Sequence, residues 1–304
     1  MTKYKYKIKK CAKCGRRTSS QVEGVFICKT CQNEVKMNLE KELLEDGFEY
    51  TKNNNSVRLN LRNEKEDKIM IYGVGDVHIG SKESNHEKFL EDIEMIKKDK
   101  YARVILMGDL LDCATKKSVG AGTFQNKMNP HEQYEFMLKA LKPIKNKIYG
   151  IHQGNHEERI FNETGINLSK IMANQLGTRY LGYGAFHKIK VGKNNYTIYS
   201  THGSSGATLP HTKIKRCLDL ATFIDVDIYM MGHVHQLQCQ PQEYRKIDLK
   251  NKQVIKNKKF FILTGHYLNW DDSYAEMKSM RPSSQGCARI RLEGKKNKKI
   301  YCSI

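Results

Sequence analysis

Five apolar segments of this sequence each run straight into a short polar cluster built from glycine, aspartate, asparagine and histidine. The clusters are Gly75-Asp76-Val77-His78, Gly108-Asp109-Leu110-Leu111-Asp112, Gly154-Asn155-His156-Glu157, Thr201-His202-Gly203 and Gly232-His233-Val234-His235. The segments in front of them are short and rich in aliphatic residues, as expected of buried strands. Because the carboxyl ends of neighbouring strands in an open α/β sheet meet at one crevice, we expect the clusters to converge on one site.

Helical patterns alternate with these strands through the middle of the chain. Apolar residues predict helices near residues 86–98, 131–142 and 213–223, and further strands near 185–191, 196–201, 260–264, 287–292 and 299–303. This order predicts an α/β fold with a buried mixed sheet, or two packed sheets, and helices outside.

The polar side chains of the clusters form a set of nitrogen and oxygen ligands. Carboxylates, one amide oxygen and several imidazoles together suit a first-row divalent metal better than calcium, which prefers oxygen alone. Taken singly, each motif is as readily a turn or a surface histidine. Their recurrence at five strand ends favours a metal site.

The motifs Asp76-x-His78, Gly108-Asp109-x-x-Asp112, Gly154-Asn155-His156-Glu157, His202 and Gly232-His233-x-His235 resemble, in this order, those of the calcineurin-like metallophosphoesterase superfamily. The resemblance implies a sandwich of two packed mixed β-sheets flanked by helices, with two metals where strand ends meet. It implies that the first metal is held by Asp76, His78, Asp109 and His235. The second would be held by Asp109, Asn155, His202 and His233, so that Asp109 bridges the two.

The resemblance also implies the catalytic roles. His156 would face the substrate, as a general acid or as a stabiliser of the phosphoryl oxygens, and Asp112 would orient His156. The expected reaction is phosphoester hydrolysis, in which metal-bound hydroxide attacks phosphorus in line and no Ser or Cys nucleophile is needed. We expect Mn²⁺ first, with iron, zinc, cobalt or nickel as alternatives.

Two branches of the superfamily differ from this chain in one motif each. The protein serine/threonine phosphatase branch shares Gly-Asn-His-Glu, but it has Asp-Arg-Gly where this chain has Asp112-Cys113-Ala114. The double-strand-break-repair nuclease branch usually has Asp at the position of Glu157. The chain is more similar to phosphoesterases often encoded by phages and low-GC bacteria, whose substrates these motifs do not define.

Four of the nine cysteines lie near the start of the chain as two Cys-x-x-Cys pairs, Cys11 with Cys14 and Cys28 with Cys31. Four thiolates from two such pairs can form a closed tetrahedral zinc site, and the segment resembles a zinc ribbon. The alternative, a redox-active cysteine pair, lacks the surrounding βαβ pattern. We therefore expect a zinc-ribbon-like module at residues 1–36, a helix-and-hairpin connector at 37–66, and the metallophosphoesterase domain at 67–304.

The charge of the chain indicates what kind of partner it has. The sequence holds 53 Lys and Arg against 33 Asp and Glu, a net charge of +20, which favours polyanions. We therefore expect a nuclease or phosphodiesterase that acts on DNA or RNA. The alternatives are a protein or small-nucleotide phosphatase whose zinc ribbon docks a protein partner, and a non-catalytic binding protein on the same scaffold.

The sequence shows no run of about 18 apolar residues and no secretion signal. We therefore expect no membrane partner and a cytoplasmic location, in a bacterium or in an infected host cell.

Overall fold

The computed structural model divides the chain into two compact units, Met1–Val57 and Arg58–Ile304. It describes residues 9–18, 21–22, 25–26, 28–31, 59–115, 118, 126–295 and 297–304. In the first unit, two pairs of short strands run antiparallel: β1 (Lys9–Lys10) with β2 (Arg17–Thr18), and β3 (Gln21–Val22) with β4 (Val25–Phe26). Residues 37–58 of the expected helix-and-hairpin connector lie outside the described residues.

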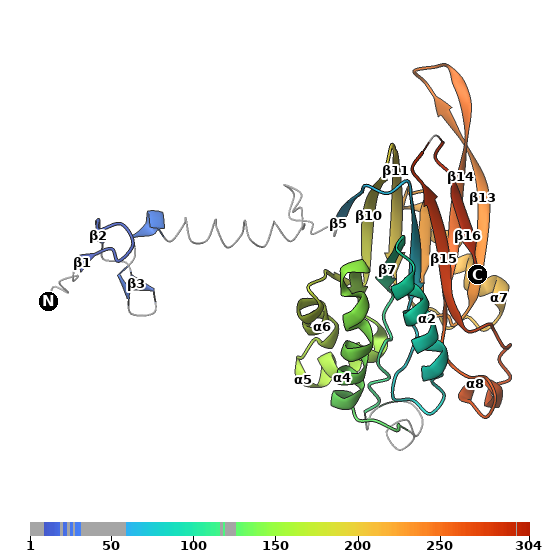
Figure 1. The fold of residues 1–304 in the computed structure, drawn as a ribbon, viewed down its shortest axis with the longest axis horizontal. Helices are drawn as coiled ribbons and strands as arrows, with labels where there is room; N and C mark the ends of the chain where they lie inside the picture. The colour runs from blue at the N-terminus through green and yellow to red at the C-terminus, as the bar shows by residue number, and fades with distance from the viewer. Residues whose placement is uncertain are drawn as a thin grey trace, which may run out of the picture. The chain divides into compact units, whose positions relative to one another are not determined.

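The second unit is built around a twelve-stranded mixed sheet that curls on itself (Figure 1). Its strands are β5 (Leu59–Glu64), β6 (Lys68–Val74), β7 (Ala102–Leu106), β8 (Ile148–His152), β9 (Tyr180–Gly182), β10 (Gly184–Val191), β11 (Asn194–Thr201), β12 (Ile228–Met231), β13 (Leu237–Asp248), β14 (Gln253–His266), β15 (Gly286–Glu293) and β16 (Ile300–Ser303). The order is β5-β10-β11-β12-β14-β15-β6-β7-β8-β9, with β13 beside β14 and β16 beside β15. The sheet therefore has two halves, which meet where β14 pairs with β15.

Alternating side chains on the strands explain why the sheet has apolar layers on both faces. On β6, Ile69 and Ile71 point into a core that also contains residues of β10, β11, β12 and β14, so this core lies between the two halves of the sheet. The intervening Tyr72 and Val74 belong to a second core on the opposite face. Because successive side chains of a strand point to opposite faces, a continuous apolar run lets one strand serve both cores.

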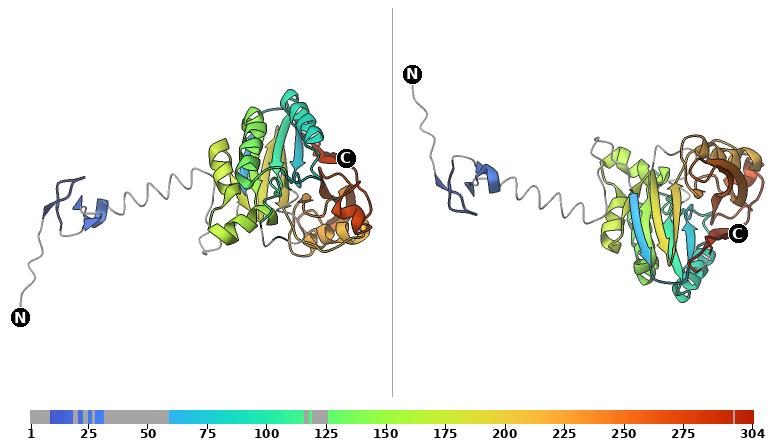
Figure 2. Two further views of the ribbon diagram at one scale, coloured as in Figure 1. Left: turned by 90° about the horizontal axis from the view of Figure 1, so that it is seen from below. Right: turned by 90° about the horizontal axis from the view of Figure 1, so that it is seen from above.

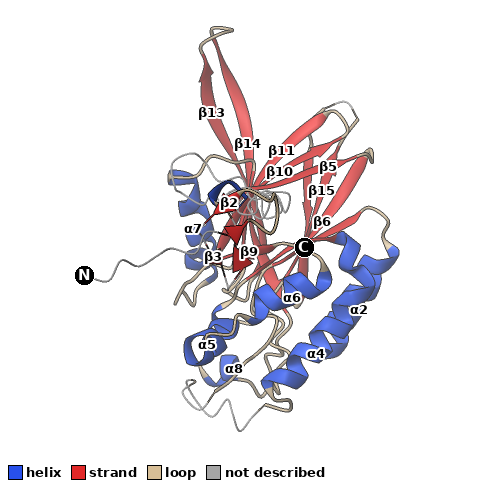
Figure 3. Ribbon diagram, turned by 90° about the vertical axis from the view of Figure 1, so that its left-hand side faces the viewer, coloured by secondary structure: helices blue, strands red, loops and turns tan. Residues whose placement is uncertain are grey.

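Helices cover the outer faces of both halves. The second core contains residues of α2 (His86–Lys98), α4 (Pro130–Leu141), the 3-10 helix η1 (Lys142–Lys147) and α6 (Leu168–Leu176). On the other half, α7 (Pro210–Asp219) packs against β12 and β14, and η2 (Leu220–Thr222) follows it. Figure 2 shows α7 apart from the green helices around α4, and Figure 3 shows α2, α4 and α6 together. The expected α/β fold with two packed sheet layers and outer helices is confirmed, and both layers belong to one curled sheet.

Residues 59–64, which we expected in a connector, form β5 at the edge of this sheet. The strand pairs parallel with β10, from Leu59 opposite Phe186 to Glu64 opposite Val191. The Asn60 amide also donates to the carbonyl of Tyr149 on β8. These contacts tie the segment to the larger unit.

Two short helices complete the unit: α5 (Asn155–Thr164) and α8 (Tyr274–Met277). No helix among the residues that the structure describes is long and apolar enough to cross a membrane.

Candidate metal centre

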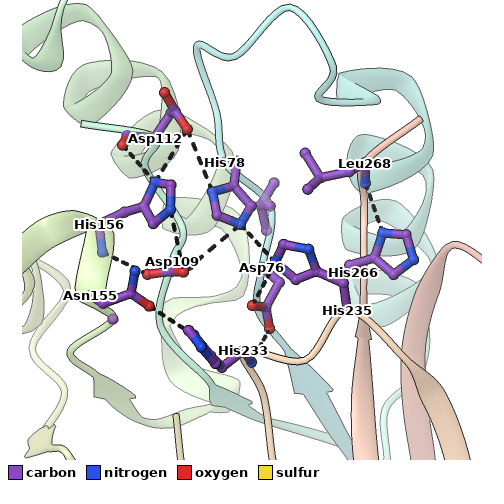
Figure 4. Close-up of polar contacts among 12 residues, drawn as sticks. Asp76, His78, Asp109, Asp112, Asn155, His156, His233, His235, His266 and Leu268 are labelled. Carbon is purple, nitrogen blue, oxygen red and sulfur yellow. Dashed lines mark hydrogen bonds and ion pairs between the residues drawn. The ribbon is translucent and has the colours of Figure 1, made fainter. Parts of the chain in front are cut away.

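The five polar clusters follow the carboxyl ends of β6, β7, β8, β11 and β12, and their side chains meet in one place (Figure 4). Three overlapping groups have ligand atoms within 4.8 Å of one another: Asp76 with His78 and His235, His78 with Asp109 and His156, and Asp109 with His202 and His233. Asp109 belongs to two of the groups, as a bridging ligand must.

The first group brings two imidazole nitrogens and a carboxylate together. The Nε2 atom of His235 lies 3.3 Å from Asp76 Oδ1 and 3.2 Å from His78 Nε2. All three residues follow β6 or β12, which belong to opposite halves of the curled sheet. The first set of ligands expected from the sequence is therefore assembled where the two halves meet.

The second group is built around Asp109. His202 Nε2 lies 3.3 Å from Asp109 Oδ2 and 3.0 Å from Asn155 Oδ1. His233 Nδ1 lies 2.8 Å from the same Asn155 oxygen. The other ring nitrogen of His202, Nδ1, lies 2.9 Å from the Met107 carbonyl. A proton on Nδ1 would bond that carbonyl and leave Nε2 free as a metal ligand.

Five of the seven expected metal ligands have a backbone conformation that residues other than glycine rarely adopt. Their φ angles lie between 47° and 67°, at Asp76, His78, Asp109, His233 and His235. Such conformations cost about 1–2 kcal/mol each. Backbone bonds between the loops after β6 and β7 help to hold them, since His78 N donates to the Asp109 carbonyl. Strained backbone of this kind clusters at functional sites.

Two properties of the site suit divalent metals: its ligand atoms are carboxylate and amide oxygens and imidazole nitrogens, and one buried carboxylate oxygen has no hydrogen-bond donor among the described residues. The Asp76 side chain is fully buried, yet its Oδ1 accepts no hydrogen bond from the residues that the structure describes. Burial lowers the pKa of His202, but the Asp109 carboxylate outweighs burial and raises it to about 10. The carboxylates therefore create a strong preference for positive charge in a buried place, which a cation bound by neutral imidazoles would satisfy.

His156 and Asp112, the expected catalytic pair, are in contact. His156 Nδ1 lies 2.8 Å from the backbone carbonyl of Asp112 and 3.2 Å from its Oδ1. Burial lowers the pKa of His156, whereas the carboxylates of Asp109 and Asp112 raise it, and the net shift is upward. His156 Nε2 lies 3.9 Å from Asp109 Oδ2, which places the ring beside the bridging carboxylate.

Arg159 and Glu157 contact residues of the site, although the motifs gave them no role. The Arg159 guanidinium nitrogens lie 3.1 Å from His156 Nδ1 and 3.0 Å from His156 Nε2. The spacing of three residues on helix α5 was the available signal, because side chains at i and i+3 are neighbours on a helix.

The Glu157 carboxylate is buried and accepts three backbone N–H groups, from Asp109, Leu111 and Gly154. Burial and the charge of Asp109 raise its pKa to about 7. Glu157 thus ties the loop after β7 to the start of α5. A side chain at Gly154 would clash with this arrangement, since its Cβ would lie 2.1 Å from Asp109 N.

The four N-terminal cysteines lie together in the first unit. Their sulfur atoms are all within 4.8 Å of one another, with 3.6 Å between those of Cys14 and Cys28, and none is in a disulfide. The Cys28 N–H donates to the sulfur of Cys11. Zinc–sulfur bonds of about 2.3 Å would separate the sulfurs of a tetrahedral site by about 3.8 Å. The cluster therefore fits a zinc ribbon.

Comparison with known proteins places the chain in a family. Residues 69–237 match the model of the calcineurin-like phosphoesterase family, and since they make up more than half of the 304 residues, the chain belongs to that family. It is a metal-dependent phosphoesterase, as its motifs predicted. No curated protein matches the sequence.

Several solved structures match as well. Vps29 from Entamoeba histolytica, complexed with Zn²⁺, is 15% identical over 77% of this chain and 98% of that chain, with a TM-score of 0.37. A predicted phosphoesterase from Streptococcus pneumoniae is 14% identical over 77% and 88%, with a TM-score of 0.32. A metallophosphoesterase from Sphaerobacter thermophilus is 14% identical over 74% and 84%, with a TM-score of 0.34.

Proposed function

We propose that this phosphoesterase is a manganese-dependent nuclease or phosphodiesterase that acts on DNA or RNA. The observation that carries the proposal is the basic hairpin of β13 and β14, which extends beyond the neighbouring strands (Figure 1). We call residues 241–258 of this hairpin the arm. Six cations on it are exposed: Arg245, Lys246, Lys250, Lys252, Lys256 and Lys258. None of them forms an ion pair with a residue that the structure describes.

The arm supports a polyanionic substrate because of its charge and shape. Only Glu243 and Asp248 oppose the six cations, and the Asp248 carboxylate accepts bonds from the turn that follows it. Exposed cations without carboxylate partners attract nucleic-acid phosphates regardless of sequence. The arm lies at the end of the two strands remote from the site, since β13 begins after His235 and β14 ends at His266. A polymer that contacts both the arm and the metal centre must therefore run along the length of the hairpin.

The residues of the site fit phosphodiester hydrolysis. When bound, two divalent metals would supply the Lewis acidity that activates a water and neutralises the attacking and leaving oxygens. Asp76, His78, Asp109 and His235 would hold one metal, and Asp109, Asn155, His202 and His233 the other. His156 holds a proton that it can deliver to the leaving oxygen, and Asp112 orients its ring. The carboxylates of Asp109 and Asp112 raise the pKa of His156, which favours the protonated ring.

We further propose that the four-cysteine cluster binds zinc and that the first unit binds nucleic acid. The described part of this unit carries exposed cations, among them Lys9, Lys10 and Lys13. A ribbon that docks a protein partner is the alternative, and it would accompany phosphatase activity.

The test is a substrate panel with purified protein and Mn²⁺. It compares single- and double-stranded DNA and RNA, a cyclic nucleotide, a small phosphodiester, a phosphomonoester and a phosphopeptide. We expect cleavage of at least one polymer, and loss of that cleavage in Asp109→Asn and His156→Ala. Hydrolysis of only the phosphopeptide or the monoester would overturn the nuclease proposal.

A further inference from the structure

A cleft of about 540 Å³ opens beside the second metal group. Its wall includes the expected metal ligands Asn155 and His202, so it is continuous with the place where phosphorus would react. A second hollow of about 610 Å³, between residues 205–209 and the start of α7, shares Arg216 with it. Both volumes are within the range of small-molecule sites, about 300–1,000 Å³.

Two exposed aromatic rings line the cleft. Phe223, which follows η2, is 73% exposed, and Tyr183, between β9 and β10, is 56% exposed. The Tyr183 hydroxyl donates to a Glu158 oxygen at 2.5 Å, which fixes the orientation of the ring. Large aromatic side chains left in water beside a reaction centre are suited to stack on a flat apolar partner.

Among the described residues that line the cleft, the carboxylates are paired with other groups, whereas the Arg216 guanidinium is not. Two carboxylates belong to its wall, Glu158 and Asp219. Glu158 accepts the Tyr183 hydroxyl, and Asp219 lies 3.4 Å from the Lys215 ammonium. Arg216 has no ion-pair partner within the described part of the chain. Its guanidinium is therefore the group in the cleft that can bind an anion, and phosphate is the anion that its planar fork fits well.

We infer that this cleft takes an unpaired nucleotide next to the scissile phosphate, so that single-stranded nucleic acid is the substrate. This inference rests on the proposed nuclease function. Phe223 and Tyr183 stack on bases, and Arg216 binds the phosphate that follows. A base can present its flat face to these rings only after it has left the double helix. Duplex without an unpaired end is therefore a poor substrate.

The experiment compares single strands with blunt duplex of the same sequence. We expect wild-type protein with Mn²⁺ to cleave the single strand at least tenfold faster, as measured by kcat/KM. Equal rates on both would overturn the inference and leave the nuclease function standing. If no nucleic acid is cleaved at all, both proposals fail.

Variants of the rings test the stacking directly. The measured quantities are kcat/KM for the single strand relative to that for bis(p-nitrophenyl) phosphate, and the Kd of a fluorescent phosphorothioate single strand. We expect Phe223→Leu and Tyr183→Leu each to lower the ratio and weaken binding about tenfold, as expected when one base no longer stacks on a ring. Phe223→Trp keeps both values, because it keeps an aromatic face.

Matched variants separate stacking from general effects. Tyr183→Phe removes the bond to Glu158 but keeps the ring, so it retains most of the binding. Tyr301→Leu removes another exposed aromatic ring, which lies on β16 and does not line the cleft. We expect wild-type values for it. If Phe223→Leu and Tyr183→Leu behave like Tyr301→Leu, the cleft does not hold the substrate.

Discussion

At His156, the arginine three residues along helix α5 supplies positive charge beside the expected general acid. Its guanidinium also lies 3.3 Å from the Asp112 carbonyl, so it contacts both residues of the pair. The chain has Cys113 where the similar phosphatase branch has an arginine, and we predict that Arg159 contacts the phosphate of the substrate. Arg159→Leu should lower kcat on a small phosphodiester at least tenfold, and Arg159→Lys should restore part of the loss because it keeps the charge. Unchanged kcat in Arg159→Leu would contradict this role.

Glu157 holds the backbone of two ligand loops. Glu157→Ala leaves three N–H groups without their acceptor, and each buried unsatisfied group costs about 1–3 kcal/mol. Mn²⁺ affinity should fall 10- to 100-fold, as for other residues that support metal ligands. Calorimetric titration with Mn²⁺ and thermal unfolding measure the two effects. Asn162→Ala on the exposed side of the same helix is the control and should match wild type.

The motifs at the strand ends allowed us to predict that the side chains of the seven expected metal ligands come together, because each motif needs only local spacing. The role of Glu157 could not be predicted in this way. Its three donors come from Asp109, Leu111 and Gly154, and two of these lie almost fifty residues earlier in the chain. Such contacts depend on how distant loops pack together, and local patterns in a single sequence do not predict this packing.

Among the elements, helices α2 and α4 and most buried strands lie where the apolar pattern predicted them. The long strand β13 was missed. Most of its side chains are exposed or half-buried, so it has no alternation of apolar and polar residues, and it contains Pro241. Helix α5 was missed because it is short and half of it is exposed, so it has little apolar periodicity. Helix α6 was also missed, although Met172 and Leu176 are buried at helical spacing, because it has only nine residues.

The arm gives a prediction at this scale. A variant with Arg245→Gln, Lys246→Gln, Lys256→Gln and Lys258→Gln should bind single strands more weakly, and its Kd should depend less on salt concentration. The slope of log Kd against log salt should decrease by about 0.7 for each phosphate that the variant no longer neutralises. The matched control replaces four exposed lysines away from the arm by glutamine, Lys139, Lys142, Lys145 and Lys170. It removes the same charge, so equal losses in both variants would mean that net charge, and not the arm, attracts the substrate.

At the scale of the whole molecule, the burial of His187 allows us to predict how the free energy of unfolding changes with pH. It is almost fully buried and hydrogen-bonded to Ser200 and Asn60, and burial lowers its pKa to about 3. The unfolded chain binds this proton near pH 6.5, so stability is complete above that pH and falls as the pH drops toward 3. The loss for this group is about 1.4 kcal/mol per pH unit. Urea unfolding of His187→Gln between pH 7 and pH 4 should show a slope shallower by that amount, although the variant is less stable at pH 7. Parallel slopes would show that His187 is not the titrating group.

The two units of the chain can be separated functionally through the cysteine cluster. Because each thiolate completes a tetrahedral site, Cys28→Ser should lose one zinc per chain, as measured by elemental analysis. The described residues of the first unit supply none of the metal-centre ligands, so hydrolysis of bis(p-nitrophenyl) phosphate should stay within twofold of wild type. Affinity for single strands should fall, because the exposed cations around the cluster lose their scaffold. Cys302→Ser, in β16, is the control and should keep the zinc. If Cys28→Ser retains all of its zinc and its affinity for oligonucleotides, the cysteine cluster neither holds a structural zinc nor contributes to nucleic-acid binding.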